Sequence, residues 1–287
     1  MSSVTNLIWL TPAKFEREWL LSLLGPVNER DGNTNEMYEN EPVFIMNSVV
    51  KEYEAYFARY EAARISYAVI HLSDEYYQDS YQFYEHEMCR FVIRNYFHPV
   101  LARMPKVKTI GLGWRDGFAK EPVPIVPWSE RPITVSFAGN VHHELREQFI
   151  SAFRPVQPNA FYLTRNGFNS ANGLPLPEYK ALMANSKYVL CPIGHWNIDC
   201  FRIYEALEAG AVPIAYSITR AQPWFYWKAL FQTDFIPFIH EANARECYEA
   251  LKQRQKNPET EEMEAKRTHL FWEDAKRRWG VISACSC

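Results

Sequence analysis

The sequence lacks every feature that would place it in a membrane. Its 287 residues contain no run of about 20 consecutive apolar residues, the length that a helix needs to span a bilayer. The apolar segment 6–10 is too short for a secretory signal, and Lys14, Glu16 and Arg17 follow it at once. We therefore expect a naturally soluble, cytoplasmic protein with no membrane span.

Two further absences exclude other classes of protein. The net charge is only −3, so the chain offers no positive surface of the kind that holds nucleic acid. None of its 6 cysteines forms a C-x-x-C pair, which makes a zinc or redox motif unexpected and favours free thiols in a reducing compartment. No cofactor or resident metal is expected.

What the sequence does have is an ordinary globular composition that is rich in aromatic residues. Hydrophobic residues make up 47% and charged residues 23% of the chain, and its length suits two domains. Its 9 Trp, 17 Tyr and 18 Phe would suit a sugar-binding cleft, because aromatic faces stack on sugar rings. Most of them are nevertheless expected in hydrophobic cores.

Strand-like and helix-like segments alternate along the chain, a pattern typical of parallel sheets with helices on both faces. We expect an N-terminal Rossmann-like domain over residues 1–120, a proline-rich linker over 121–131, a second such domain over 132–258 and a closing helix over 259–287. Strands are expected at 6–10, 42–50, 65–72, 107–112, 133–138, 159–164, 187–191 and 212–216, and helices at 11–24, 51–64, 80–95, 141–153, 178–185, 200–209, 245–256 and 259–279.

The rest of the chain is organised around residues 186–216, which predict a strand, a loop, a helix and a second strand. Asp199 stands where a helix N-cap belongs, and Gly210 where a helix ends. The first-turn amides of a helix favour an anion such as phosphate. Arg202 could grip phosphate oxygens there, and Glu205, three residues on, could accept hydrogen bonds from a ribose diol. The alternative is an ordinary Arg–Glu pair on a solvated helix face.

This stretch resembles the exostosin-like glycosyltransferases, family 47. Fainter matches lie at residues 95–99 and 110–118, and the small size is similar to that of the soluble exostosin-like enzymes of large algal viruses. The matching residues are Ser186-Lys187-Tyr188-Val189-Leu190-Cys191-Pro192, Gly194, Asp199-Cys200-Phe201-Arg202-Ile203-Tyr204-Glu205-Ala206-Leu207, Gly210 and Pro213.

The resemblance implies an α/β fold of the GT-B type, in which two Rossmann-like doubly wound domains face each other across a cleft. It also implies that the C-terminal domain binds a nucleotide-sugar donor, that the anomeric carbon is inverted, and that no metal is obligatory. The residues that we expect to bind the donor are Gly139, Asn140, Tyr162, Thr164, Pro192, Gly194, Asp199, Cys200, Phe201, Arg202 and Glu205.

An inverting transfer needs a base for the acceptor hydroxyl, and a carboxylate of the N-terminal domain is the natural supply. We expect Asp74, with Glu75 in reserve and Asp79 or Asp116 behind them; Asp74 could instead cap the turn after its strand. His71 could serve there too, although it reads as a buried strand residue. Candidate contacts to the leaving group or acceptor are His71, Trp114, Arg115 and Lys187.

The function expected from these residues is transfer of a sugar, with xylose favoured, from a UDP-sugar to a hydroxyl of a glycan such as an N-glycan. The chain has no D-x-D motif and so no evident ligand pair for metal-dependent transfer. Two alternatives remain, a retaining GT-B transferase and a non-catalytic module that binds a nucleotide sugar or glycan.

Overall fold

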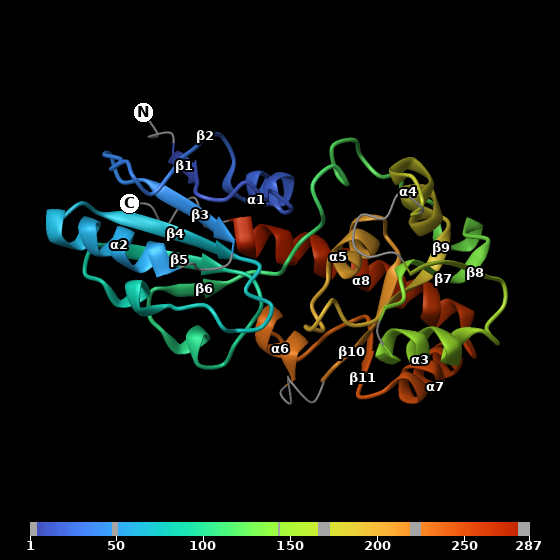
Figure 1. Cartoon of the computed structure of the whole chain (residues 1–287). Helices are drawn as coiled ribbons and strands as arrows, with labels where there is room; N and C mark the ends of the chain where they lie inside the picture. The colour runs from blue at the N-terminus through green and yellow to red at the C-terminus, as the bar shows by residue number, and fades with distance from the viewer. Residues whose placement is uncertain (1–4, 48–50, 143, 166–172, 219–224, 281–287) are drawn as a thin grey trace. The chain divides into compact units, whose positions relative to one another are not determined.

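The computed structural model describes residues 5–47, 51–142, 144–165, 173–218 and 225–280. The chain forms two compact units (Figure 1). The first comprises residues up to Leu112 together with the end of the last helix from Trp279, and the second comprises Gly113–Arg278. None of the helices in the described ranges is long and apolar enough to cross a membrane.

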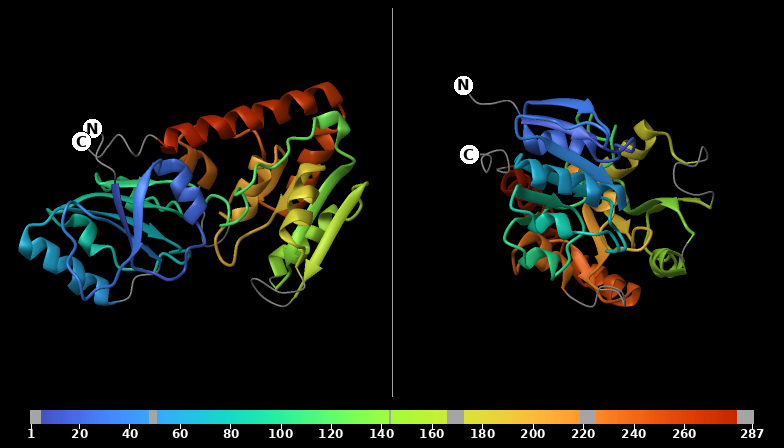
Figure 2. Two further views of the ribbon diagram at one scale, coloured as in Figure 1. Left: turned by 90° about the horizontal axis from the view of Figure 1, so that it is seen from above. Right: turned by 60° about the vertical axis from the view of Figure 1, so that its left-hand side comes forward.

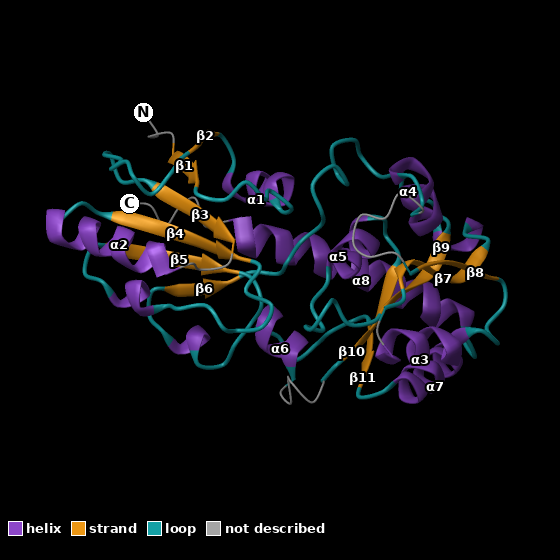
Figure 3. Cartoon of the chain, in the orientation of Figure 1, coloured by secondary structure: helices purple, strands orange, loops and turns teal. Residues whose placement is uncertain are grey.

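The first unit is built on a sheet of six parallel strands in the order β2-β1-β3-β4-β5-β6 (Figure 3). Apolar, β-branched segments supply the central strands, which are buried along almost their whole length. The elements are β1 (Thr5–Trp9), α1 (Arg17–Leu24), β2 (Val27–Asp31), β3 (Val43–Asn47), α2 (Lys51–Ala63), β4 (Tyr67–Leu72), η1 (Gln82–Glu85), β5 (Cys89–Arg94), η2 (Leu101–Arg103) and β6 (Val107–Thr109).

The second unit has a sheet of five parallel strands in the order β11-β10-β9-β7-β8. Helices α4 and α5 lie on one side of it, and α3 and α7 lie together on the other (Figures 1 and 2). The elements are η3 (Trp128–Glu130), β7 (Ile133–Asn140), α3 (Glu144–Phe153), β8 (Asn159–Thr164), α4 (Leu176–Ala184), β9 (Ser186–Cys191), α5 (Phe201–Glu208), β10 (Val212–Tyr216), α6 (Tyr226–Phe231), β11 (Ile239–Glu241), α7 (Ala244–Arg254) and α8 (Pro258–Gly280).

The helix expected at residues 80–95 is wrong. A short 3-10 turn, Gln82–Glu85, is followed by strand β5, Cys89–Arg94, which pairs with both β4 and β6. Tyr84 does not lie on a helix face but packs against His71 of β4. The apolar, partly β-branched run of Cys89–Arg94 therefore satisfies its backbone in the sheet, and tertiary pairing overrides the helical spacing of the aromatic residues.

The helix expected from residue 11 starts later, at Arg17. The Thr11 hydroxyl accepts a hydrogen bond from the Ala13 amide at 3.2 Å, so it closes a local turn and does not cap the helix. The expected loop at the end of this region instead begins with β2, a polar edge strand whose side chains are mostly exposed. The short strand β11 was also not expected.

Aromatic side chains fill the core of the first unit, as the sequence predicted for most of them. Phe44 of β3 meets Tyr56 and Tyr60 of α2 edge to face, with ring centroids 5.5 and 5.3 Å apart. Phe57 stacks on both Tyr67 and Phe83. These rings are fully buried or nearly so, and such pairs add about 0.5–1.5 kcal/mol each to the stabilisation from burial.

Candidate functional site

The predicted strand, loop, helix and strand of residues 186–216 is present as β9, α5 and β10, with β9 and β10 parallel neighbours. Helix α5 begins at Phe201, and its N-cap residue is Cys200, so the expectation that Asp199 caps it is wrong. The buried Asp199 carboxylate instead accepts a hydrogen bond from the Tyr226 hydroxyl of α6 at 2.9 Å. Since no side chain caps α5, its first-turn amides are available to an anion.

Arg202 lies in the first turn of α5 and reaches across to the end of β7. Its Nε donates to the Ala138 carbonyl at 3.2 Å, and its guanidinium lies 4.5 Å from the centroid of the Phe137 ring. Gly139 has φ +149°, and a Cβ there would collide with Arg202 Nη2. A glycine is therefore required for the guanidinium to lie flat against this strand end. The structure thus brings together two predicted residues, Gly139 and Arg202, that are far apart in the sequence.

Glu205 is not part of a solvated Arg–Glu pair, because it is only 5% exposed. Its carboxylate accepts hydrogen bonds from the Tyr179 hydroxyl of α4 at 2.6 Å and from the Arg115 amide at 3.4 Å. Burial raises its pKa, an effect that the Tyr179 hydrogen bond and the charge of Arg202 oppose. The alternative of an exposed surface pair is therefore excluded, and Glu205 has acceptor positions left for a ligand.

Asn140, the last residue of β7, is a buried polar side chain at the same edge of the sheet. Neither its amide nitrogen nor its amide oxygen has a hydrogen-bond partner among the residues that the structure describes. Leaving a buried amide unsatisfied costs free energy. A bound ligand with polar atoms would satisfy it, so Asn140 fits the predicted donor contact.

The loop between β9 and α5 carries the other predicted donor residues, and local contacts fix its path. The Gly194 amide donates to the Asn197 carbonyl at 2.5 Å, and the Cys200 thiol lies 3.5 Å from the Pro192 carbonyl. Pro192 and Cys200 are buried, whereas Gly194 and Phe201 are half-buried. These four residues therefore shape the loop, with Gly194 and Phe201 at its accessible side.

Arg146 belongs to this site, although the sequence gave no sign of it. This buried residue in the first turn of α3 donates to three carbonyls, those of Ile193 at 2.9 Å, Asn140 at 2.8 Å and Gly194 at 2.6 Å. A single guanidinium thus ties the end of β7 to the loop after β9. An arginine in a first helical turn ordinarily reads as a solvated residue, so only the tertiary structure reveals this role.

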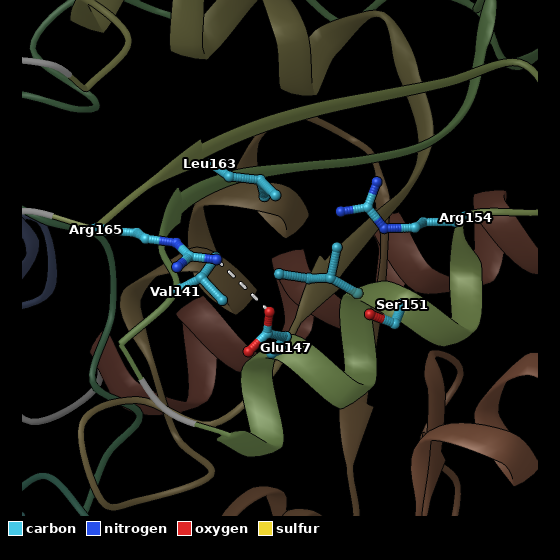
Figure 4. Close-up of a pocket in the computed structure, with 7 residues that line it drawn as sticks. Val141, Glu147, Ser151, Arg154, Leu163 and Arg165 are labelled. Atoms are coloured by element: carbon cyan, nitrogen blue, oxygen red, sulfur yellow. Dashed lines mark ion pairs between the residues drawn. The ribbon is translucent and has the colours of Figure 1, made fainter.

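Tyr162 and Thr164 lie on the edge strand β8, near the same end of the sheet. Leu163 and Arg165 point to the side covered by α3, where they line a hollow of about 50 Å³ and Arg165 pairs with Glu147 at 3.7 Å (Figure 4). Because side chains alternate along a strand, Tyr162 and Thr164 face the opposite side. Tyr162 is 48% exposed there and is free of the core.

Two other predicted contacts have neighbours of their own. Lys187 is at the start of β9, at the end opposite to the α5 loop, where its Nζ lies 4.0 Å from Glu261 Oε2 and over the Trp128 ring. The Trp114 ring is buried and meets Trp272 of α8 edge to face. Neither side chain therefore joins the group around Arg202. The exposed Arg115 does so through its amide.

In the first unit, Asp74 is buried and held by three donors. Its Oδ2 accepts from Arg94 Nη2 at 2.9 Å, and its Oδ1 accepts from the backbone amides of Gln78 at 2.9 Å and Asp79 at 3.4 Å. This is the capping arrangement that the sequence left open as the alternative to catalysis. Glu75 is half-buried and Asp116 is exposed.

His71 is a buried residue of β4. Its Nδ1 lies 2.5 Å from the Tyr84 hydroxyl and its Nε2 lies 2.8 Å from Asp79 Oδ2. Burial lowers its pKa, which favours the neutral ring. His71, Asp74 and Asp79 offer ligand atoms within 4.8 Å of one another, but Arg94 already supplies a positive charge to Asp74. These side chains thus complete a polar network in the protein itself.

Glu16 is a second functional candidate that the sequence did not single out. This residue precedes α1, and its side chain is 1% exposed. Its Oε1 accepts from the Ser73 hydroxyl at 3.2 Å and from Asn95 Nδ2 at 3.4 Å. Burial raises its pKa from 4.5 to about 7. No local pattern announces such a carboxyl group, because its partners come from the ends of β4 and β5.

Two units, each with a parallel sheet flanked by helices and one with an anion-accepting edge, define a glycosyltransferase of the GT-B fold that uses a nucleotide sugar. The chain belongs to the family of the RXYLT1 C-terminal domain, whose model matches residues 119–279. This family is exostosin-like, so the resemblance seen in the sequence is confirmed.

Solved structures agree with this fold. The chain is similar to an α1,3-fucosyltransferase, with 12% identity, a TM-score of 0.53 and coverage of 95% of this chain and 90% of that one. It is also similar to T4 phage BGT, solved in complex with UDP and Mn2+, with 10% identity, a TM-score of 0.49 and coverage of 99% and 100%. None of the curated proteins compared with the chain matches its sequence significantly.

Proposed function

We propose that the protein transfers a sugar from a UDP-sugar to a hydroxyl of a glycan, with inversion at the anomeric carbon and without a metal ion. The observation that carries this proposal is the group at the carboxyl edge of the second unit's sheet. There the uncapped first turn of α5, the Arg202 guanidinium and the buried Glu205 carboxylate lie beside the glycine end of β7. Xylose is the proposed donor sugar, because enzymes of xylosyl transfer are among those that the sequence resembles.

In this proposal the diphosphate binds at the start of α5. Its negative charge grows as the bond to the sugar breaks, and preorganised donors lower the barrier by stabilising that charge. Arg202 and the α5 amides supply these donors, which makes a metal unnecessary for the leaving group. Glu205 holds the ribose hydroxyls with its remaining acceptor positions while Tyr179 fixes its orientation.

Inversion also needs a group that removes the acceptor's proton. The sequence proposed Asp74 for this role. In the structure both of its oxygens are committed, one of them to an arginine. A retaining transferase would need no such base, and a non-catalytic module would bind UDP without transferring or hydrolysing any donor.

A thermal-shift screen of UDP-, GDP- and CMP-sugars, with and without EDTA, tests the donor class and the need for metal together. A ligand that binds the folded state raises the apparent stability, by about 2.7 kcal/mol at 100 times its dissociation constant. We expect a shift with UDP and UDP-xylose that EDTA leaves unchanged. A shift with GDP-sugars alone, or one abolished by EDTA, would overturn the proposal.

A further inference from the structure

A buried carboxyl group, Glu16, lies at the carboxyl edge of the first unit's sheet. Ser73 directly follows β4 and Asn95 directly follows β5, and both donate a hydrogen bond to Glu16 Oε1. Its second oxygen, Oε2, is buried and has no hydrogen-bond partner among the residues in the described ranges. The carboxyl ends of parallel strands are where open α/β sheets bind ligands.

Ser73 connects this carboxyl group to the surface. It is half-buried, whereas Glu16 and Asn95 are each 1% exposed. Its φ of +62° is unusual for a residue other than glycine, and the Asn95 side chain holds this conformation by accepting from the Ser73 amide at 3.0 Å. Strained backbone of this kind persists only where the surroundings impose it, and it concentrates at functional sites.

We propose that Ser73 and Glu16 together receive the proton that the acceptor hydroxyl loses during transfer. This inference rests on the proposed function. As the acceptor oxygen bonds to the anomeric carbon, its O–H bond breaks and Ser73 Oγ takes the proton. Ser73 passes its own proton to Glu16 Oε1, and the electron pair of the breaking C–O bond leaves with the diphosphate. Ser73 is thus the catalytic group and Glu16 the proton store behind it.

The protonation of Glu16 suits this role. Burial, the largest cause, raises its pKa to about 7, so it accepts and releases a proton near neutral pH. The charged groups of the neighbouring elements are paired with one another and not with Glu16. Arg17 bonds to Glu29 of β2, Lys14 to Asp31, and Arg94 of β5 to Asp74. Asp74, by contrast, has a guanidinium on one oxygen and two amides on the other.

The test compares the full chain with its Glu16→Gln, Ser73→Ala and Ser73→Thr variants, using UDP-xylose and whichever methyl glycoside the wild type glycosylates best. General-base catalysis contributes about 10²–10⁴-fold, so we expect Glu16→Gln to lower kcat by about that factor. The rise of kcat with pH through about 7 should vanish in the variant. Ser73→Ala should lose activity in the same way, and Ser73→Thr, which keeps the hydroxyl, should retain most of it.

Folding and donor binding separate this role from a merely structural one. Glu16→Gln should melt no lower than the wild type at about pH 8, because it removes a buried charge, and both proteins should bind UDP equally. The exposed Glu39→Gln is the matched control and should behave as the wild type. Wild-type turnover that Glu16→Gln and Ser73→Ala leave intact would overturn this inference alone. A wild type that neither binds UDP nor transfers sugar would instead refute the proposed function.

Discussion

At the scale of single residues, the side chains that matter most are those whose charge or polarity is buried. Glu16, Glu205 and Arg146 are each at most 8% exposed. A carboxyl group removed from water resists ionisation, so burial raises the pKa of both glutamates. Such residues are costly to stability unless they serve a function.

Glu16 makes this cost measurable as a dependence of stability on pH. Its folded-state pKa of about 7 lies above the ordinary value of 4.5, so its favourable contribution is fully present below pH 4.5 and is lost as the pH rises through 7. At 1.36 kcal/mol per pKa unit the loss is about 3 kcal/mol. Chemical denaturation of the wild type and Glu16→Gln at a series of pH values should show their difference in unfolding free energy changing by about this amount. Parallel pH curves would contradict it.

At the scale of secondary-structure elements, the donor site depends on how two loops are joined. Arg146 of α3 bonds to carbonyls at the end of β7 and in the loop after β9. Its positive charge is also felt at the start of α5, where it opposes the effect of burial on the pKa of Cys200. The helix start that we propose to hold the diphosphate is therefore positioned and polarised from a second helix.

Replacing Arg146 should accordingly weaken donor binding as well as folding. Hydrogen bonds from charged groups contribute about 1.5–3 kcal/mol each, and Arg146→Met leaves three carbonyls without their donor. We expect the dissociation constant of UDP to rise at least about tenfold, and Arg146→Lys, which keeps the charge, to recover part of the affinity. The exposed Arg154→Met, just beyond the same helix, is the matched control. Arg146→Met that is destabilised yet binds UDP with unchanged affinity would contradict the positioning role.

Hydrophobic pattern predicted most of these elements, because strands such as β8 and β10 and helices such as α2 have strong local signals. It failed at β5, whose aromatic neighbours have a helix-like spacing, and at β2, a polar edge strand. It found Arg202, Glu205 and Gly139 because they stand at a strand end or a helix start. It missed Arg146 and Glu16, whose partners lie 6–48 and 57–79 residues away along the chain.

At the scale of the whole molecule, the chain divides its tasks between two units of similar construction. The second unit contains the family's domain and the group around Arg202, and the first contains the network of Glu16, Ser73 and Asn95. Each group lies at the carboxyl edge of its own parallel sheet, as general rules for α/β proteins lead one to expect. Donor binding and proton transfer should therefore be separable by mutation.

The central claim is that the first turn of α5 and Arg202 bind the diphosphate of UDP, and calorimetric titration of UDP into the wild type and Arg202→Ala tests it most directly. Loss of a charge-assisted contact should weaken binding by about 1.5–3 kcal/mol. Arg154→Ala serves as the control and should bind UDP as the wild type does. A folded Arg202→Ala protein with the wild-type dissociation constant would show that the diphosphate binds elsewhere.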